Sequence, residues 1–273
     1  MRTSVRTSLR YLLLAAIAVV VLFPIYITVV NALLPVQLIG HRPPVLFPSH
    51  PLWSDFSQAW SGGSLSQYLR TSAIVSISIT VGSVATSVLA AYAFAFLEFP
   101  LKRVLFGLCL ATLMVPAEVT ITPNYRTIRV FGWFDTYPAL IVPFVASGLG
   151  IFLFRQSFRQ LPRELRDAAV LDGYGHWRFL LRVVLPLNRP MLSAFAIFAW
   201  LGAWNQYLWP LLVTNTDARR TVQVGLRQLE GLSVSAPNVV FAGTILAALP
   251  IFAVLFLFQR QLVRGLTAGA VKG

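Results

Sequence analysis

The sequence predicts an all-α integral membrane protein with six transmembrane helices. Hydrophobic residues make up 57% of the 273-residue chain and charged residues only 11%, whereas a soluble domain has about 45–50% and about 25%. Six apolar runs are each long enough to cross the hydrocarbon core, which takes roughly 20 helical residues. We expect the whole chain, residues 1–273, to form a single transmembrane domain.

The first apolar run follows three arginines and resembles a secretory signal, but it is too long and no small-residue cleavage site closes it. A long outer loop rich in Pro, Ser and aromatic residues comes next. The second run carries many small residues, which let neighbouring helices approach closely. In the third run, Pro116 and Pro123 favour an opened helix. The expected spans are about 11–34, 71–97, 104–123, 136–158, 191–212 and 239–258.

Lys and Arg are unevenly distributed between the two sides of the membrane that these spans define. The termini and the even-numbered connections hold 15 of the 22. Because cytoplasmic loops carry the excess of basic residues, both termini and the loop 159–190 are expected in the cytoplasm. This orientation also explains the net charge of +13. The basic residues are spread over short loops, so nucleic acid is not an expected partner.

The loop 159–190 is the only long polar interval that predicts two short helices. The first, expected over 161–172, has Pro162 in its first turn and Gly173 as a left-handed stop. Glu164 and Asp167 lie near its positive end. Its acidic residues also suit the basic rim of a partner's cleft, while its apolar spacing predicts one shared face. The acidic residues are Glu164, Asp167 and Asp172, and the shared face comprises Leu165, Ala168 and Ala169.

The second helix of this loop is predicted to be amphipathic and to end at Pro186 and Pro190. Its apolar stripe comprises Trp177, Leu180, Leu181 and Val184. Two alanines leave the first helix thin enough to enter a cleft of a partner protein. Residue types alone favour this docking role and an ordinary solvated loop equally.

The order of residues in this loop resembles the EAA loop of permease subunits of ATP-binding-cassette (ABC) importers. Asp167-Ala168-Ala169 is followed after three residues by Gly173 and after nine more by Val183-Val184-Leu185-Pro186. Asp167 stands where the family usually has Glu, and Tyr174 where a small residue is common. Other segments resemble the carbohydrate-type, maltose-permease-like members: FPIYITVVNALL, LMVPAEVTITPNY, GIFLFRQSFRQLPRELRDAAVLDG, WNQYLWPLLVT and QRQLVRGLTAGAVKG.

Within that family the chain is most similar to the second-permease group of importers for glycerol-3-phosphate and glycerophosphodiesters. The resemblance implies a type I ABC importer permease fold with a cytoplasmic coupling helix, in a bacterial inner membrane. It implies a homologous permease, an ATPase dimer and an extracytoplasmic substrate-binding protein as partners, besides membrane lipid. The implied function is import of glycerol-3-phosphate or of glycerophosphodiesters such as glycerophosphocholine. The alternative is a neutral di- or oligosaccharide.

The resemblance also implies roles for individual residues of the loop. The ATPase-coupling residues are Glu164, Asp167, Ala168, Ala169, Asp172 and Gly173. No phosphate-binding GxxxxGK[ST] loop, GxSxG motif or catalytic acid pair occurs in the sequence, so we expect no enzyme activity. ATP and Mg²⁺ are expected on the partner ATPase, with no cofactor in this chain. His41, His50 and His176 lack metal-ligand spacing, and Cys109 is the single cysteine.

Two further features are candidates for the translocation pathway. Glu118 lies in a span, where a carboxylate tends to face protein or water, although a position at the outer interface explains it equally well. The aromatic and amide residues of the fifth span suit a polyhydroxylated ligand slightly better than an interfacial aromatic belt. They are Trp204, Asn205, Gln206 and Tyr207. Arg126 and Arg129, in an outer segment, are placed to attract a phosphate ester.

Overall fold

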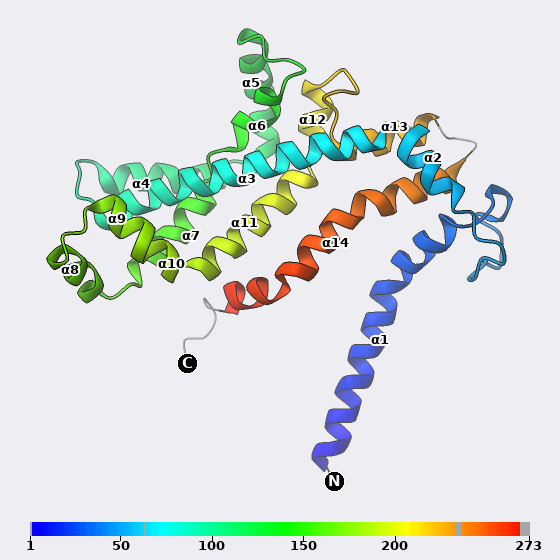
Figure 1. Ribbon diagram of the computed structural model, residues 1–273, viewed down its shortest axis with the longest axis horizontal. Helices are drawn as coiled ribbons and strands as arrows, with labels where there is room; N and C mark the ends of the chain where they lie inside the picture. The colour runs from blue at the N-terminus through cyan, green and yellow to red at the C-terminus, as the bar shows by residue number, and fades with distance from the viewer. Residues whose placement is uncertain (1, 63, 233–235, 268–273) are drawn as a thin grey trace. The chain divides into compact units, whose positions relative to one another are not determined.

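The computed structural model describes residues 2–62, 64–232 and 236–267, which form helices joined by turns and loops without a β-strand (Figure 1). The all-α fold class is therefore confirmed. The end of the segment QRQLVRGLTAGAVKG lies outside the described residues. The α-helices are α1 (Arg2–Asn31), α2 (Ser54–Gly62), α3 (Leu65–Phe96), α4 (Lys102–Ala111), α5 (Ala117–Val130), α6 (Tyr137–Ile141), α7 (Gly148–Arg159), α8 (Arg163–Leu171), α9 (His176–Phe179), α10 (Leu185–Leu187), α11 (Arg189–Trp204), α12 (Leu208–Val213), α13 (Val222–Leu232) and α14 (Pro237–Thr267).

Three of these helices, α1, α3 and α14, are long and apolar enough to cross a membrane in one piece. Three further spans are broken. Lys102–Met114 and Ala117–Val130 meet at 103°, Tyr137–Phe144 and Gly148–Arg159 at 43°, and His176–Leu187 and Arg189–Trp204 at 81°. Counting each bent pair as one span gives six candidate spans among the described residues, the number that the apolar runs predict.

The break in the third span lies at Val115 and Pro116, within the run that we expected to be one span. Val115 is extended, with φ −87° and ψ 117°. A residue before proline is driven out of the α region, and Pro116 has no N–H to continue the helix. Pro123, the predicted end of the span, lies inside α5 instead. The opening predicted near Glu118 is therefore present, but it precedes Glu118.

The fifth predicted span, 191–212, was wrong in its second half. Helix α11 ends at Trp204, and Asn205 caps it by donating its side-chain amide to the Leu201 carbonyl over 2.9 Å. A continuous helix would place the Pro210 ring against the carbonyl four residues earlier and would lack the proline's hydrogen bond. The chain therefore restarts as α12 at Leu208.

The chain divides into two compact units. The first comprises Met1–Gln67 and Gly225–Pro250. Most apolar side chains along α1 are exposed, as expected for a helix surrounded by lipid. In the same unit the buried Asn238 side-chain N–H donates to the Asp55 carboxylate over 2.6 Å, so a buried polar pair joins α14 to α2.

The second unit comprises Tyr68–Val224 and Ile251–Gly273 and contains two hydrophobic cores. One core is centred on Phe154, Phe158 and Phe195, and it holds the loop after α7. The other lies around Trp209, whose indole N–H donates to the Ala139 carbonyl over 2.9 Å. Within this unit, α8 and α9 lie at one end, away from α5, α6 and α12 (Figure 1). Small α3 residues predicted to allow close packing are buried: Ser76, Ser83, Ser87 and Ala91.

Candidate functional site

The predicted first helix of the loop 159–190 is α8, and local signals set both of its ends. Pro162 is the residue before its first turn, and Glu164 lies within that turn. At the other end Asp172 caps the helix and Gly173 adopts φ +72°. The N–H of Tyr174 then donates to the Ala169 carbonyl over 2.8 Å, closing the helix in the manner of a glycine C-cap.

Helix α8 is attached to the rest of the chain through one side only. Ala169 is 5% exposed and belongs to the core that contains Phe179, with Tyr174 packed against it. All other α8 side chains are exposed, and Leu171 is 88% exposed. The acidic residues Glu164, Asp167 and Asp172 are exposed too. A short helix with so much open surface is suited to bind a partner.

The two alanines of α8 do not share one free face. Ala168 is exposed, whereas Ala169 faces the chain's own core. The spacing that places Leu165, Ala168 and Ala169 on one face therefore does not give them equal exposure. Residue spacing alone did not identify Tyr174 and Phe179, which follow in the same loop, as the residues that cover Ala169.

The second helix of the loop is longer than predicted. It runs from α9 through the π-helical segment η4 (Leu180–Val184) into α10, and Pro186 lies within it. The bend falls at Asn188, whose buried side-chain amide donates to the Val184 carbonyl over 2.7 Å. A π turn advances the chain by more residues than an α turn, which changes the exposed face. Leu180 and Val184 are buried, but Trp177 and Leu181 are 66% and 58% exposed.

Two polar links join this loop to the spanning helices. The Tyr92 hydroxyl, on α3, lies 2.9 Å from His176 Nδ1, on α9. The Ser157 hydroxyl, on α7, donates to the side-chain amide oxygen (Oδ1) of Asn188. Neither pair could be predicted from the sequence, because each joins residues that are far apart in the chain. These contacts connect the loop directly to α3 and α7.

Glu118 and the outer arginines lie on α5. Glu118 is in the first turn after Pro116 and is exposed, and among the described residues it forms no ion pair. Arg126 and Arg129 are exposed, with the Arg129 guanidinium 6.0 Å from the centre of the Tyr125 ring. These side chains are available to solvent or to a ligand.

The candidate residues near the end of α11 fall into two groups. Trp204 is 2% exposed and stacks on Trp200 with ring centres 5.0 Å apart. The Trp204 indole N–H and the side-chain amide oxygen of Gln206 are buried without hydrogen-bond partners in the described part of the chain. Asn205 and Tyr207 are exposed, and Asn205 accepts a hydrogen bond from Gln223 over 3.4 Å. The non-helical segment thus offers amide and hydroxyl groups next to the buried Trp204.

A polar clasp that the sequence did not reveal joins the start of α6 to the loop after α12. Asp135 has φ +58°, and its carboxylate accepts hydrogen bonds from the N–H of Asn215 and from the N–H and hydroxyl of Thr216, over 2.7–3.2 Å. Partial burial alone would raise the pKa of Asp135. The three hydrogen bonds and the Arg219 charge outweigh that effect and hold its pKa below the usual 3.8.

This clasp predicts a measurable pH dependence. Because the folded-state pKa of Asp135 is lowered, the carboxylate's contribution is complete above 3.8 and is lost as pH falls through the lower folded value. We expect the Asn215 and Thr216 amides to keep their hydrogen-exchange protection until the pH is below 3.8. Asp135→Asn, which tolerates the same backbone conformation, should show weaker protection without this pH dependence. Equal pH dependence in both proteins would contradict the assignment.

No group of three His, Cys, Asp or Glu residues in the described chain is arranged to hold a metal ion. The coupling-loop candidates lie on one helix and its C-terminal turn. Glu118 makes no hydrogen bond or ion pair with the Trp204–Tyr207 segment among the described residues, so these candidates are not joined by direct polar contacts.

Comparison with known proteins identifies the family. The family described as "Binding-protein-dependent transport system inner membrane component" matches residues 82–268. The sn-glycerol-3-phosphate transport system permease protein UgpE of Rhizobium meliloti (strain 1021) is 40% identical over 267 residues, 94% of either chain. The protein of the same name from Yersinia pestis is 38% identical over 255 residues, 90% of either chain.

Solved structures agree on the fold. A chain from the crystal structure of a bacterial ABC transporter involved in the import of the acidic polysaccharide alginate matches with a TM-score of 0.83 and 19% identity, covering 94% of this chain and 96% of the other. The resemblance to permease subunits of ABC importers is confirmed by the family match and by the relatives of about 40% identity. The chain belongs to the family of binding-protein-dependent transport system inner membrane components, the permeases of ABC importers.

Proposed function

We propose that this chain forms half of the translocation pathway of an ATP-driven importer for glycerol-3-phosphate or glycerophosphodiesters such as glycerophosphocholine. The observation that carries this proposal is the 40% identity, over 94% of either chain, to a permease named for sn-glycerol-3-phosphate transport. The alginate transporter is too distant, at 19% identity, to bear on the substrate. A homologous permease supplies the other half of the pathway, and an extracytoplasmic binding protein delivers the substrate.

Helix α8 is the proposed contact with a dimer of separate ATPase subunits, which bind ATP and Mg²⁺. Its exposed residues Glu164, Asp167, Ala168 and Asp172 face the ATPase, and Gly173 fixes the turn that follows. Ala169 supports the helix from inside rather than touching the partner. This arrangement requires α8 and both chain termini to lie in the cytoplasm, in agreement with the excess of Lys and Arg on that side.

The proposed pathway residues lie on α5 and after α11. Asn205, Gln206 and Tyr207 supply hydrogen-bonding groups, while the buried Trp204 holds the segment in place by stacking on Trp200. Glu118 borders the pathway near the break before α5. Amides next to aromatic rings suit a small polyhydroxylated ligand, with hydrogen bonds to hydroxyls and ring faces against carbon.

The test is ATP hydrolysis by the complete importer, reconstituted in lipid vesicles with its binding protein. We expect glycerol-3-phosphate or glycerophosphocholine to accelerate hydrolysis several-fold and maltose to have no effect. Binding protein without ligand is the control. Stimulation by maltose alone would retain the importer and reject the phosphate-ester substrate. If neither the binding protein nor any ligand changed the rate of ATP hydrolysis, the assignment as an importer would be rejected.

A further inference from the structure

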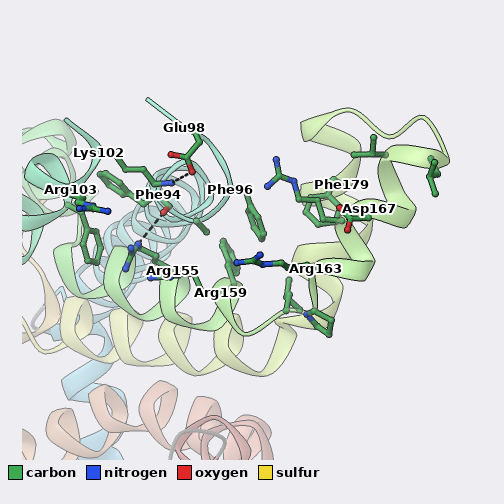
Figure 2. A pocket seen from close by; sticks show the side chains of 18 residues that line it. Phe94, Phe96, Glu98, Lys102, Arg103, Arg155, Arg159, Arg163, Asp167 and Phe179 are labelled. Carbon is green, nitrogen blue, oxygen red and sulfur yellow. Dashed lines mark hydrogen bonds and ion pairs between the residues drawn. The ribbon is translucent and has the colours of Figure 1, made fainter. Parts of the chain in front are cut away.

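A basic cleft of about 1250 Å³ lies next to α8, where α3 and α7 end and α4 begins, all within the second unit (Figure 2). Phenylalanine rings form much of its wall. Its charged lining is strongly unbalanced, since only Glu98 and Asp167 are acidic. The basic lining residues are Lys102, Arg103, Arg155, Arg159, Arg163 and Arg166.

The acidic residues of the cleft do not neutralise its arginines. Glu98 pairs with Lys102 over 3.2 Å, and in the described residues no cleft arginine forms an ion pair. Arg155 and Arg159 lie four residues apart on α7, where two like charges repel each other. The helix dipole favours Arg159 in the last turn, but it does not account for Arg155 one turn earlier. A bound anion would relieve this repulsion.

Arg155 is fixed on the membrane side of the cleft. Its Nε donates to the Phe94 carbonyl over 3.2 Å, and its guanidinium lies 4.0 Å from the centre of the Phe106 ring (Figure 2). These contacts use one N–H and one face, which leaves the other guanidinium N–H groups for an anion. Arg103, at the start of α4, and Arg159, at the end of α7, line the same cleft and are exposed.

The position of Arg103, Arg155 and Arg159 indicates which kind of anion would bind. Each belongs to a helix of a candidate span: Arg103 and Arg159 lie at helix ends and Arg155 lies one turn inside, the part of a spanning helix expected next to the lipid headgroups. Beyond Arg103 the apolar residues Val104, Leu105 and Leu108 of α4 are exposed and offer a surface for acyl chains. Basic pockets between spans on the cytoplasmic side are known to suit anionic lipid headgroups. Arg163 and Arg166, by contrast, lie on α8, the proposed ATPase contact.

We propose that an anionic phospholipid occupies the membrane side of this cleft, with its phosphate held by Arg103, Arg155 and Arg159 and its chains along α4. The inference goes beyond the proposed function and does not depend on which substrate is carried. By binding arginines of both α4 and α7, the lipid would stabilise the position of these two helices next to the coupling helix α8.

The test is native mass spectrometry of the assembled importer, titrated with dioleoylphosphatidylglycerol or dioleoylphosphatidylcholine. We expect the wild-type complex to retain the anionic lipid preferentially. The double variant Arg103→Gln, Arg159→Gln should bind it more weakly by roughly fivefold for each arginine removed, a typical effect of one basic side chain near an anionic surface. Arg182→Gln is the matched control, because Arg182 is exposed in the same loop but does not line the cleft.

The same spectra report the mass of the complex and therefore its assembly; if the double variant does not assemble, the two single variants take its place. Equal retention of the two lipids by the wild type would overturn the proposal, as would unchanged phosphatidylglycerol affinity in the variants. The proposal would also be overturned if the variants bound the lipid normally but lost the ATPase. That result would mean that the arginines contact acidic residues of the ATPase instead of a lipid. This experiment does not measure stimulation by substrate. A negative result for lipid binding would therefore leave the proposed transport function unaffected.

Discussion

Asp167→Lys is expected to lower substrate-stimulated ATP hydrolysis of the reconstituted importer by more than about tenfold. Asp167 is exposed on α8, and in the proposed complex its carboxylate meets basic groups of the ATPase. Reversing one charge of a buried interfacial pair costs about 2–5 kcal/mol, since the partner's charge is left without compensation. The helix itself should persist, because its core contact is Ala169. The measurement is stimulated hydrolysis at fixed protein concentration.

The control for this variant is Arg182→Glu, an equally large charge change at an exposed position in the same loop. Because Arg182 lies on η4 rather than on α8, its reversal should alter hydrolysis by no more than about twofold, as is usual for surface substitutions. Co-purification of the ATPase should weaken in Asp167→Lys alone. If Asp167→Lys kept full stimulation, α8 would not be the coupling contact, whatever the substrate.

Local signals predicted the elements that depend only on neighbouring residues. Helix α8 was expected over 161–172 and occupies Arg163–Leu171, because Pro162 and Gly173 fix its ends without help from the rest of the chain. The apolar runs likewise predicted the long helices, since burial in lipid requires only length and hydrophobicity. Helices α3 and α14 extend beyond the predicted spans because a helix can continue past the bilayer surface.

The sequence was less informative wherever backbone breaks or distant contacts decide the structure. Hydropathy averaged over the length of a span does not register the break at Val115 or the end of α11 at Trp204, because apolar residues lie on both sides of each. The clasp of Asp135 and Thr216 joins residues 81 positions apart, and the pair Tyr92 and His176 joins residues 84 apart. Such contacts depend on tertiary packing, which single-sequence patterns do not contain.

A second large effect is expected from Gly150→Val, because α7 approaches both α3 and α11 closely at Gly150. A Cβ atom there would lie 2.6 Å from Cζ of Phe195 and 2.9 Å from Cβ of Ser87. Both neighbours are buried, and Ser87 Cβ is attached directly to the α3 backbone, so α3 would have to move. Overpacking of this kind costs about 3 kcal/mol, which corresponds to a fall of about 6–12 °C in the unfolding temperature.

The measurement is the apparent unfolding temperature of the purified chain in detergent, followed by tryptophan fluorescence at one fixed scan rate, because unfolding of such proteins is often irreversible. Gly107→Val on α4 is the matched control, since no atom lies within 4 Å of the position its Cβ would take. Valine has a somewhat higher helix propensity than glycine, so Gly107→Val should leave the unfolding temperature nearly unchanged. Equal unfolding temperatures for the two variants would mean that α3, α7 and α11 can separate at Gly150 without cost. The small residues of α3 would then not be what holds these helices together.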